Sequence, residues 1–468
     1  MLEDSEDIQL SLLSRDDSNE LTTERAITRP IHYLGSKLRI LGSIREALDF
    51  VEPTGGRVCD LFAGSGTVSL ALSATRSVIA VDIQEYSRVL CSALLNPSLF
   101  GKKDLLDSIV TQARSSTHYK DLIYAIEPLM EHELNCLRLA ESGEIELLCD
   151  LVEQGSILAY ELGESQASRG SLRIALSTSM LRLKKLGFAD TAEALATRYF
   201  GGIYYSYSQA AQLDAILEAI ANLVPVAEQD GFQAALLSTA SEVVNTVGRQ
   251  FAQPIRFRTK GGHAKRHLVG QVLRDRSVDA SRVFAGWLSR YSQLPPAERR
   301  HEAVRADYRE AIASLGGKVS AVYADPPYTR DHYSRYYHVL ETLCLRDNPA
   351  VSTVLSGGRH RLSRGLYRAS RHQSPFCIMS QGPEAFSALF HGVQQLDVPL
   401  VLSYSPYNRG NGSRPRVLML EDIQTLAQRV FSRVTIVPAG RMAHSKLNAV
   451  GRNAPITYDA EVLIVCQP

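Results

Sequence analysis

A strand–turn–helix–strand pattern near the N-terminus constrains the fold more than any other feature of the sequence. Residues Arg57–Phe62 read RVCDLF, an apolar stretch with β-branched and aromatic side chains that predicts a strand. The glycine-rich turn Ala63–Thr67 and the helix-like sequence VSLALSA at 68–74 follow it. Ser77–Asp82 (SVIAVD) then predicts a second strand that ends in an acid. Two strands joined by a helix through short links form a parallel pair, so the pattern predicts an α/β protein.

Five further segments have strand character later in the chain. They are His301–Asp307, Val319–Asp325, Val398–Ser405, Arg433–Ala439 and Glu461–Cys466. Helical segments such as Tyr308–Ser314 and Leu420–Phe431 fall between some of them. Seven strands with interleaved helices predict a doubly wound α/β domain with a mostly parallel sheet.

A long stretch with helical patterning separates the first two strands from the other five. Leu, Ala, Glu and Lys recur there at helical spacing, as in Asp104–Thr111, His132–Ala140 and Gln212–Leu223. We therefore divide the chain into an acidic, disordered tail (1–25), a domain formed by 26–100 and 301–468, and an inserted, mainly helical region (101–300).

The composition excludes several classes of protein. The chain of 468 residues is 45% hydrophobic and 22% charged, as in ordinary globular proteins, and has no apolar run long enough to span a bilayer. Its acidic start does not resemble a secretory signal. The seven cysteines are scattered without the spacing of a metal or redox site. We therefore expect a cytoplasmic protein that needs neither a membrane nor a metal.

The charge distribution indicates a local anionic partner. The net charge is only +1, yet Arg249–Arg276 contains eight Arg or Lys residues and one acid. Arg359–His372 contains five arginines and no acid. Such stretches in a neutral chain are typical of contacts with an anion such as a nucleic-acid backbone, although solvated charged loops would have the same composition.

The glycine turn and the acid after it suggest a cofactor. Gly64 and Gly66 let the backbone approach a ligand closely. Ser69 stands where the dinucleotide fingerprint requires a third glycine, so that pattern is absent. Asp82 at the end of the second strand could hold two ribose hydroxyls or could cap the next helix. Together the turn and Asp82 predict a cofactor that contains adenosine.

A second turn, Asp325-Pro326-Pro327-Tyr328, follows the strand VSAVYA. The two prolines stiffen the backbone and remove two N–H donors, which leaves the Asp325 carboxylate and the Pro326 carbonyl as acceptors beside the Tyr328 ring. This set suits a planar base with an amino group, because the amine can donate to both acceptors while the base stacks on the tyrosine. A rigid turn without a ligand is the alternative interpretation.

These elements, in this order, resemble the Dam-like (D12 class) adenine-N6-specific DNA methyltransferases. The resemblance rests on His32–Leu38 (HYLGSKL), Asp60–Gly66, Asp82 and Asp325–Tyr328, and covers roughly 31–84 and 301–337. It implies a class I methyltransferase (Rossmann-like) fold, in which the last of the seven strands is antiparallel. It also implies S-adenosyl-L-methionine as cofactor and double-stranded DNA as substrate. The region 101–300 then takes the place of the family's target-recognition domain, although it is longer than in the simplest members.

The resemblance also implies roles for individual residues. Asp325, Pro326, Pro327 and Tyr328 would form the catalytic turn, with Lys37 facing the cofactor carboxylate. The residues that would bind the cofactor are Tyr33, Gly35, Lys37, Asp60, Phe62, Gly64, Gly66, Asp82 and Asp307. Asp307 is the looser assignment, because only an acid at the end of a strand matches there.

The DNA contacts are predicted from charge and aromatic content. Residues 329–340 (TRDHYSRYYHVL) mix arginines and histidines with tyrosines and could close over an extruded nucleotide, or form a helix that packs its tyrosines on the domain. The candidate DNA-binding residues in this segment and in the basic stretch are Arg258, Lys260, Lys265, Arg266, Arg330, Arg335 and Tyr336.

The predicted reaction is transfer of a methyl group to N6 of an adenine that has been flipped out of the duplex. At family level this suggests restriction-modification or phage defence in a bacterial or archaeal cell, at the nucleoid, with a cognate restriction or defence protein as a possible partner. Two alternatives stay open. One is methylation of RNA adenine N6 or of a protein amide, and the other is a catalytically silent DNA-binding subunit of a larger complex.

Overall fold

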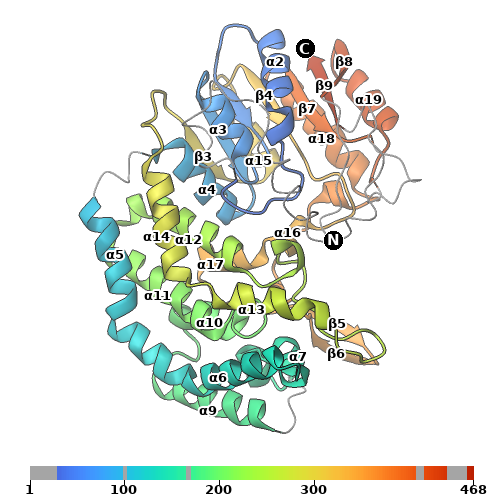
Figure 1. Ribbon diagram of the computed structural model, residues 1–468. Coiled ribbons are helices and arrows are strands. Elements are labelled where there is room, and N and C mark those ends of the chain that lie inside the picture. Colours follow the sequence, from blue (N-terminus) through green and yellow to red (C-terminus); the bar gives the residue numbers. More distant parts are fainter. Residues whose placement is uncertain (1–28, 98–102, 165–169, 407–415, 440–460) are drawn as a thin grey trace, which may run out of the picture.

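A seven-stranded sheet forms the centre of one half of the molecule (Figure 1). The computed structural model describes residues 29–97, 103–164, 170–406, 416–439 and 461–468, so the predicted tail at 1–25 lies outside the described residues. The strands of this sheet are β1 (Val58–Asp60), β2 (Val78–Asp82), β3 (Glu302–Arg305), β4 (Ala321–Ala324), β7 (Leu400–Tyr404), β8 (Arg433–Pro438) and β9 (Val462–Gln467). Each of them coincides with one of the seven predicted strands.

The strand order is β3-β2-β1-β4-β7-β9-β8. The pairs β1–β2, β1–β4, β2–β3 and β4–β7 are parallel, whereas β9 runs antiparallel to both β7 and β8. The mostly parallel sheet with an antiparallel last strand is therefore confirmed, and it is compatible with a Rossmann-like methyltransferase. The order reverses between β1 and β4, and ligands of open α/β sheets bind at such a switch point.

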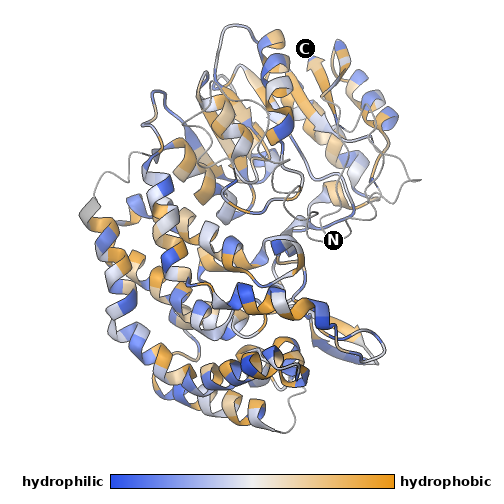
Figure 2. Cartoon of the chain, in the orientation of Figure 1, coloured by the Kyte–Doolittle hydropathy of each residue, from blue (hydrophilic) through white to orange (hydrophobic). Residues whose placement is uncertain are grey.

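Helices cover both faces of the sheet, because alternate strand residues point to opposite sides. On one face, strand residues such as Cys59, Val322 and Leu402 pack against α15, α18 and α19. On the other face, Val58, Tyr323 and their neighbours pack against α2, α3 and the end of α4. The covering helices are α2 (Leu41–Val51), α3 (Thr67–Ser73), α4 (Glu85–Leu95), α15 (Tyr308–Ser314), α18 (Gly382–Gln394) and α19 (Leu420–Gln428). Figure 2 shows the hydrophobic strands between these helices.

The chain between β2 and β3 is helical, as predicted, and lies to one side of the sheet (Figure 1). After α4 it forms α5 (Lys103–Ser115), α6 (Thr117–Glu141), α7 (Glu146–Gln154), α8 (Ile157–Glu161), α9 (Ser171–Lys185), α10 (Leu195–Phe200), α11 (Tyr207–Leu223), α12 (Gln229–Val243), α13 (Val269–Ser277) and α14 (Ala280–Ser292).

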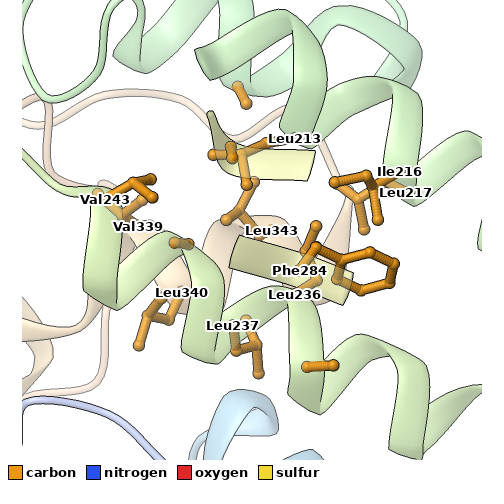
Figure 3. Packing of buried hydrophobic residues seen from close by; sticks show 14 of the residues in the cluster. Leu213, Ile216, Leu217, Leu236, Leu237, Val243, Phe284, Val339, Leu340 and Leu343 are labelled. Atoms are coloured by element: carbon orange, nitrogen blue, oxygen red, sulfur yellow. The ribbon is translucent and has the colours of Figure 1, made fainter. Parts of the chain in front are cut away.

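One helix from the C-terminal part of the chain also belongs to the core of this helical body. Val339, Leu340 and Leu343 of α17 (His338–Leu345) lie among side chains of α11, α12 and α14 (Figure 3). Helix α4 packs into the same core through Val89 and Leu90. The boundary predicted at residue 300 therefore does not separate the helices from the rest of the chain, because α17 carries the chain back into them just after the Asp325–Tyr328 turn.

The segment 329–340 contains α16 (Tyr333–Tyr336) and the start of α17, so the helical alternative describes most of it. Beyond α17 the chain forms a two-stranded antiparallel hairpin, β5 (Thr353–Ser356) and β6 (Arg359–Leu362), which the sequence analysis missed. Among the described helices, none is long and apolar enough to cross a membrane.

Candidate active site

A pocket opens at the carboxyl ends of β1, β2, β3 and β4, at the switch point of the sheet. Many predicted site residues line it, together with residues that the sequence did not suggest. The lining is Tyr33, Leu34, Lys37, Leu61, Phe62, Asp82, Ile83, Gln84, Tyr86, Ala306, Asp307, Tyr308, Asp325, Pro326, Pro327, Tyr328, Tyr333, Ser334, His372, Ser374, Pro375 and Phe376. Elements from three distant parts of the chain thus meet in one cavity.

The glycine turn after β1 lies under this pocket and depends on its two glycines. Gly64 has φ of 54° and Gly66 has φ of 77°, both in the left-handed region that glycine occupies without strain. A Cβ on Gly64 would collide with the Tyr33 ring. A Cβ on Gly66 would lie 2.8 Å from Leu94 Cδ1 and 3.2 Å from Cys91 Sγ. The turn therefore brings its backbone closer to Tyr33 and to α4 than any other residue type would permit.

Ser69, at the position where the dinucleotide pattern has glycine, holds the acid that ends β1. Its hydroxyl donates to Asp60 Oδ2 over 2.6 Å, and both groups are buried. Burial raises the pKa of Asp60 to about 7, although the Ser69 hydrogen bond opposes the shift. Among the described residues, Asp60 Oδ1 is buried without a hydrogen-bond partner. An unsatisfied buried acceptor is costly, and Asp60 lies behind Leu61 and Phe62, which line the pocket, without lining it itself.

Asp82 at the end of β2 is held by two backbone donors. The Gly64 N–H donates to its Oδ2 over 3.0 Å and the Gln84 N–H to its Oδ1 over 2.9 Å. Burial raises the pKa of Asp82, and these hydrogen bonds oppose the rise. The carboxylate is therefore fixed in orientation at the pocket wall, and each oxygen keeps a lone pair for a hydroxyl donor.

The turn Asp325–Tyr328 leaves the end of β4 and forms another wall. Burial raises the pKa of Asp325 to about 6, while Lys37 lowers it and Glu461 raises it. The Tyr328 ring packs at 4.9 Å from the Tyr404 ring, and the Arg416 guanidinium lies 5.3 Å from its centroid. These contacts fix the ring at the mouth of the turn.

Lys37 contacts two carboxylates of this site. Its Nζ lies 3.0 Å from Asp325 Oδ2 and 3.3 Å from Glu461 Oε1, and the lysine side chain is only 5% exposed. The resemblance places Lys37 at the cofactor carboxylate, and the structure brings it to the acid of the second turn. Glu461 appeared in the sequence only as the first residue of a strand. Nothing local distinguishes it, because it is 424 residues from Lys37 along the chain.

The N-terminal element that contains Lys37 is anchored by Tyr333 of α16 and by Tyr337, which lies between α16 and α17. The Tyr33 ring stacks on Tyr337 with 4.9 Å between centroids, and the Tyr337 hydroxyl accepts from the Leu34 N–H over 2.8 Å. Gly35 adopts φ of 73° next to the Tyr333 hydroxyl. The residues that follow the Asp325–Tyr328 turn therefore position Tyr33 and Lys37.

Phe62 and Asp307 lie on the side of the pocket nearest β3. Phe62 contacts Phe376 edge to face at 5.4 Å, and Asp307 caps α15 by accepting from the Arg309 N–H over 2.9 Å. His372 completes this wall, and burial lowers its pKa while Asp307 and Asp82 oppose the shift. No motif marks His372 or Phe376 as pocket residues, because the segment in which the chain returns to the pocket from the β5–β6 hairpin has no recognisable pattern.

The candidate DNA-binding residues are divided by the structure. Arg258 is engaged by three acids, with its guanidinium at 2.9 Å from Glu146, 2.8 Å from Asp150 and 3.1 Å from Glu153. Its placement indicates a structural role rather than a free phosphate contact, so we make no DNA proposal for it. Arg276, also in the basic stretch, is fully buried against Glu133 and stabilises the helical body.

The other candidates are more accessible. Lys265 Nζ donates to the Arg256 carbonyl over 2.9 Å, and Arg266 donates to the Gly143 carbonyl over 3.0 Å. Lys260 is exposed at a turn. Of the candidates that follow the Tyr328 turn, Arg330 contacts Met379, Arg335 lies over the Tyr367 ring, and the Tyr336 hydroxyl donates to Asp331 over 3.4 Å.

Comparison with known proteins gives one match. No curated protein and no solved structure matches the chain significantly. A match to a protein-family model begins at Tyr33 and therefore includes Lys37, the glycine turn and Asp82. The Asp325–Tyr328 turn lies beyond the matched residues. The match supports DNA methyltransferase activity: residues 33–151 match the family model of the D12 class N6 adenine-specific DNA methyltransferases.

Proposed function

We propose that the protein transfers a methyl group from S-adenosyl-L-methionine to N6 of a specific adenine in double-stranded DNA. One observation carries the proposal. The acceptor turn Asp325–Tyr328 lines the same pocket as Asp82 and as Phe62, which precedes the glycine turn, at the switch point of the sheet. A methyl donor held beside Asp82 would therefore meet an amine held by the Asp325–Tyr328 turn.

The pocket residues fit S-adenosylmethionine, which carries a sulfonium, an ammonium and a carboxylate. Asp82 has the orientation and the free lone pairs to accept from ribose hydroxyls. The unpartnered Asp60 Oδ1 suits an ammonium donor, and Phe62 suits the flat adenine. Carboxylates on three sides favour a cationic ligand. Gly64 and Gly66 would provide backbone contacts, and Tyr33, Gly35 and Asp307 would complete the binding site. The cofactor would supply an electrophilic methyl group.

The residues of the second turn would hold and activate the adenine. The Asp325 carboxylate and the Pro326 carbonyl would accept hydrogen bonds from the two N–H groups of the exocyclic amine, and Tyr328 would stack on the base. The amine of adenine is conjugated with its ring, and acceptors that draw its hydrogens out of plane restore electron density on N6. Pro327 would keep the turn rigid. Placing N6 against the methyl donor provides the rest of the acceleration, because holding both reactants in position makes a bimolecular step effectively unimolecular.

The substrate base must leave the duplex, because a stacked adenine cannot reach a pocket whose walls are half-buried. We assign target recognition to the helical region 101–300 with the additional helix α17. A long recognition region suits a dedicated, site-specific enzyme, such as one of restriction-modification or phage defence, acting at the nucleoid. A cognate restriction or defence protein would be its partner in such a system.

The proposal is tested by offering the full-length protein labelled S-adenosylmethionine with duplex DNA, structured RNA or an unrelated protein mixture. Label in duplex DNA alone is the expected result. Label in RNA or protein would replace the proposed substrate. Cofactor binding without transfer to any of the three would favour a silent subunit, and failure to bind cofactor would contradict the proposal itself.

A further inference from the structure

The β5–β6 hairpin projects from the helical body (Figure 1), and its described residues from Thr353 to Arg361 are exposed. In its register, Val354 is opposite Arg361 and Leu355 is opposite His360, so the two pairs point to opposite faces. Val354 is 51% exposed and Leu355 is 70% exposed, and both arginines of β6 are exposed. Two-stranded hairpins without cover are marginally stable in water, so a hairpin exposed in this way is better explained by a partner that covers it.

The hairpin and the chain around it carry only positive charge. The sequence has no Asp or Glu from Asn348 to Pro383, and Arg359, His360 and Arg361 form three consecutive basic residues of β6. Figure 2 shows the hydrophilic strand beside the hydrophobic one. A partner that fits this surface is a polyanion that also offers apolar contacts.

A second acid-free segment lies against the base of the hairpin. The sequence has no acid from Val243 to Arg274. Arg364 donates to the Ile255 carbonyl over 2.6 Å, and the Tyr367 hydroxyl donates to the Ala252 carbonyl. The two basic stretches, about 100 residues apart in sequence, therefore lie side by side in the structure. Arg258 and Arg368 are paired with acids there, so the positive charge of this surface comes from the other basic residues.

The same surface is connected to the candidate active site. Arg335, two residues after the start of α16, lies 5.8 Å from the Tyr367 ring, and Arg371 contacts the same ring at 5.8 Å. The next residue, His372, lines the pocket. A duplex whose extruded base occupies the pocket would thus extend past this tyrosine towards the hairpin.

We infer that the β5–β6 hairpin enters the major groove of the DNA beside the target adenine and that Arg359 and Arg361 read base edges there. The inference rests on the proposed function and adds, beside the helical region 101–300, a second element that contributes to sequence specificity. The major groove of B-DNA admits a two-stranded ribbon, and arginine makes bidentate hydrogen bonds to guanine. Val354, which is paired with Arg361 on the same face of the hairpin, can contact thymine methyl groups.

Two variants of the full-length protein separate base reading from charge attraction. Arg359→Ala/Arg361→Ala removes both the base contacts and the positive charge. Arg359→Lys/Arg361→Lys keeps the charge and loses the planar guanidinium group that makes bidentate hydrogen bonds. The control is Arg429→Ala/Arg433→Ala, which removes two exposed arginines, one directly after α19 and one at the start of the edge strand β8. Each protein is measured for its dissociation constant with S-adenosylmethionine, with a duplex carrying the methylated site, with a scrambled duplex and with an RNA duplex.

We expect both hairpin variants to lower the preference for the site over the scrambled duplex by about tenfold or more, a typical contribution of bidentate arginine contacts. The alanine variant alone should also weaken binding to scrambled DNA. The control variant should change neither the site preference nor the affinity for scrambled DNA. The affinity for S-adenosylmethionine should stay constant in all three variants, which excludes misfolding. An unchanged site preference in both hairpin variants would overturn the inference.

The outcome for the hairpin can be told apart from that for the proposed function. If the wild-type protein binds duplex DNA without methylating it, the catalytic proposal fails, and the site is replaced in the binding assay by the preferred sequence selected from a random duplex pool. If the alanine variant lost affinity for the RNA duplex as much as for the DNA site, groove insertion would be overturned. The major groove of A-form RNA is too narrow to admit a two-stranded ribbon. A wild-type protein that binds no DNA would overturn both proposals.

Discussion

Lys37 Nζ lies 3.0 Å from Oδ2 of Asp325, and it contacts Glu461 from the other side. The lysine comes from the N-terminal element and Asp325 from the turn after β4, so this ion pair links the two parts of the site that the sequence separates by 288 residues. Burial disfavours the ionised form of Asp325, Lys37 favours it, and Glu461 disfavours it. In the proposed mechanism, the charge of Asp325 at a given pH is therefore set by two neighbours with opposite effects.

Replacement of the acid itself should stop the reaction. Asp325→Ala removes one of the two acceptors for the adenine amine, so we expect loss of methyl transfer to below detection while S-adenosylmethionine still binds. Transfer of labelled methyl and equilibrium binding of labelled cofactor measure the two effects separately. Near-normal turnover in this variant would contradict the role of the turn.

The activity should depend on pH through Asp325. Its pKa is raised to about 6, and only the ionised carboxylate accepts both from the amine and from Lys37, so the rate should fall as the pH drops through about 6. Glu461→Gln removes a negative neighbour, which should lower the pKa of Asp325 and move this acid limb to lower pH. Lys37→Met should move it to higher pH.

The measurement for this pair is the rate at saturating cofactor and DNA between pH 5 and 8, so that changes in binding do not hide the shift. If the fall in rate at low pH moved in the same direction in both variants, it would be caused by the titration of a group other than Asp325.

The glycine turn should not tolerate a side chain. Gly64→Ala would place a Cβ against Tyr33 in a left-handed backbone, and we expect cofactor affinity to fall by about tenfold or more. Gly42→Ala in α2 is the matched control, because a Cβ there meets no atom within 4 Å and its backbone is helical. Isothermal titration with S-adenosylmethionine compares them, and equal affinities would remove the turn from the binding site.

Arg276 should be needed for stability rather than for DNA. Its guanidinium donates to Glu133, to Asn245 Oδ1 over 3.2 Å and to the Gly202 carbonyl over 2.7 Å, all in the buried core of the helices. Arg276→Met leaves Glu133 unpaired, and the free energy of unfolding should fall by about 3–5 kcal/mol. Denaturant unfolding measures the change, with exposed Arg274→Met as the control. Equal effects of the two variants would contradict the structural role.

The sequence predicted the sheet well because strand signals are local. The seven strands and the helical character of 101–300 follow from periodicity and short motifs, whereas the antiparallel last strand was expected from the family resemblance. The β5–β6 hairpin was missed because its strands are four residues long and both are exposed, so they lack the alternation of a half-buried strand.

Local patterns also could not reveal partners that are distant in the chain. Lys37 was recognised as a site residue, but its contact with Glu461 depends on the pairing of β9 in the sheet. In the same way, the basic stretch around Arg258 predicted free charge, whereas Glu146, Asp150 and Glu153 on α7 neutralise that arginine. Net charge of a segment does not say which of its cations face a neighbouring helix.

The central claim is tested most directly by methylating unmodified genomic DNA with the full-length protein and labelled S-adenosylmethionine, followed by nucleoside analysis and single-molecule mapping of the modified positions. The account predicts N6-methyladenine as the labelled nucleoside, at one recurring sequence. Cofactor binding without any labelled nucleoside in DNA, or label on cytosine, would contradict it.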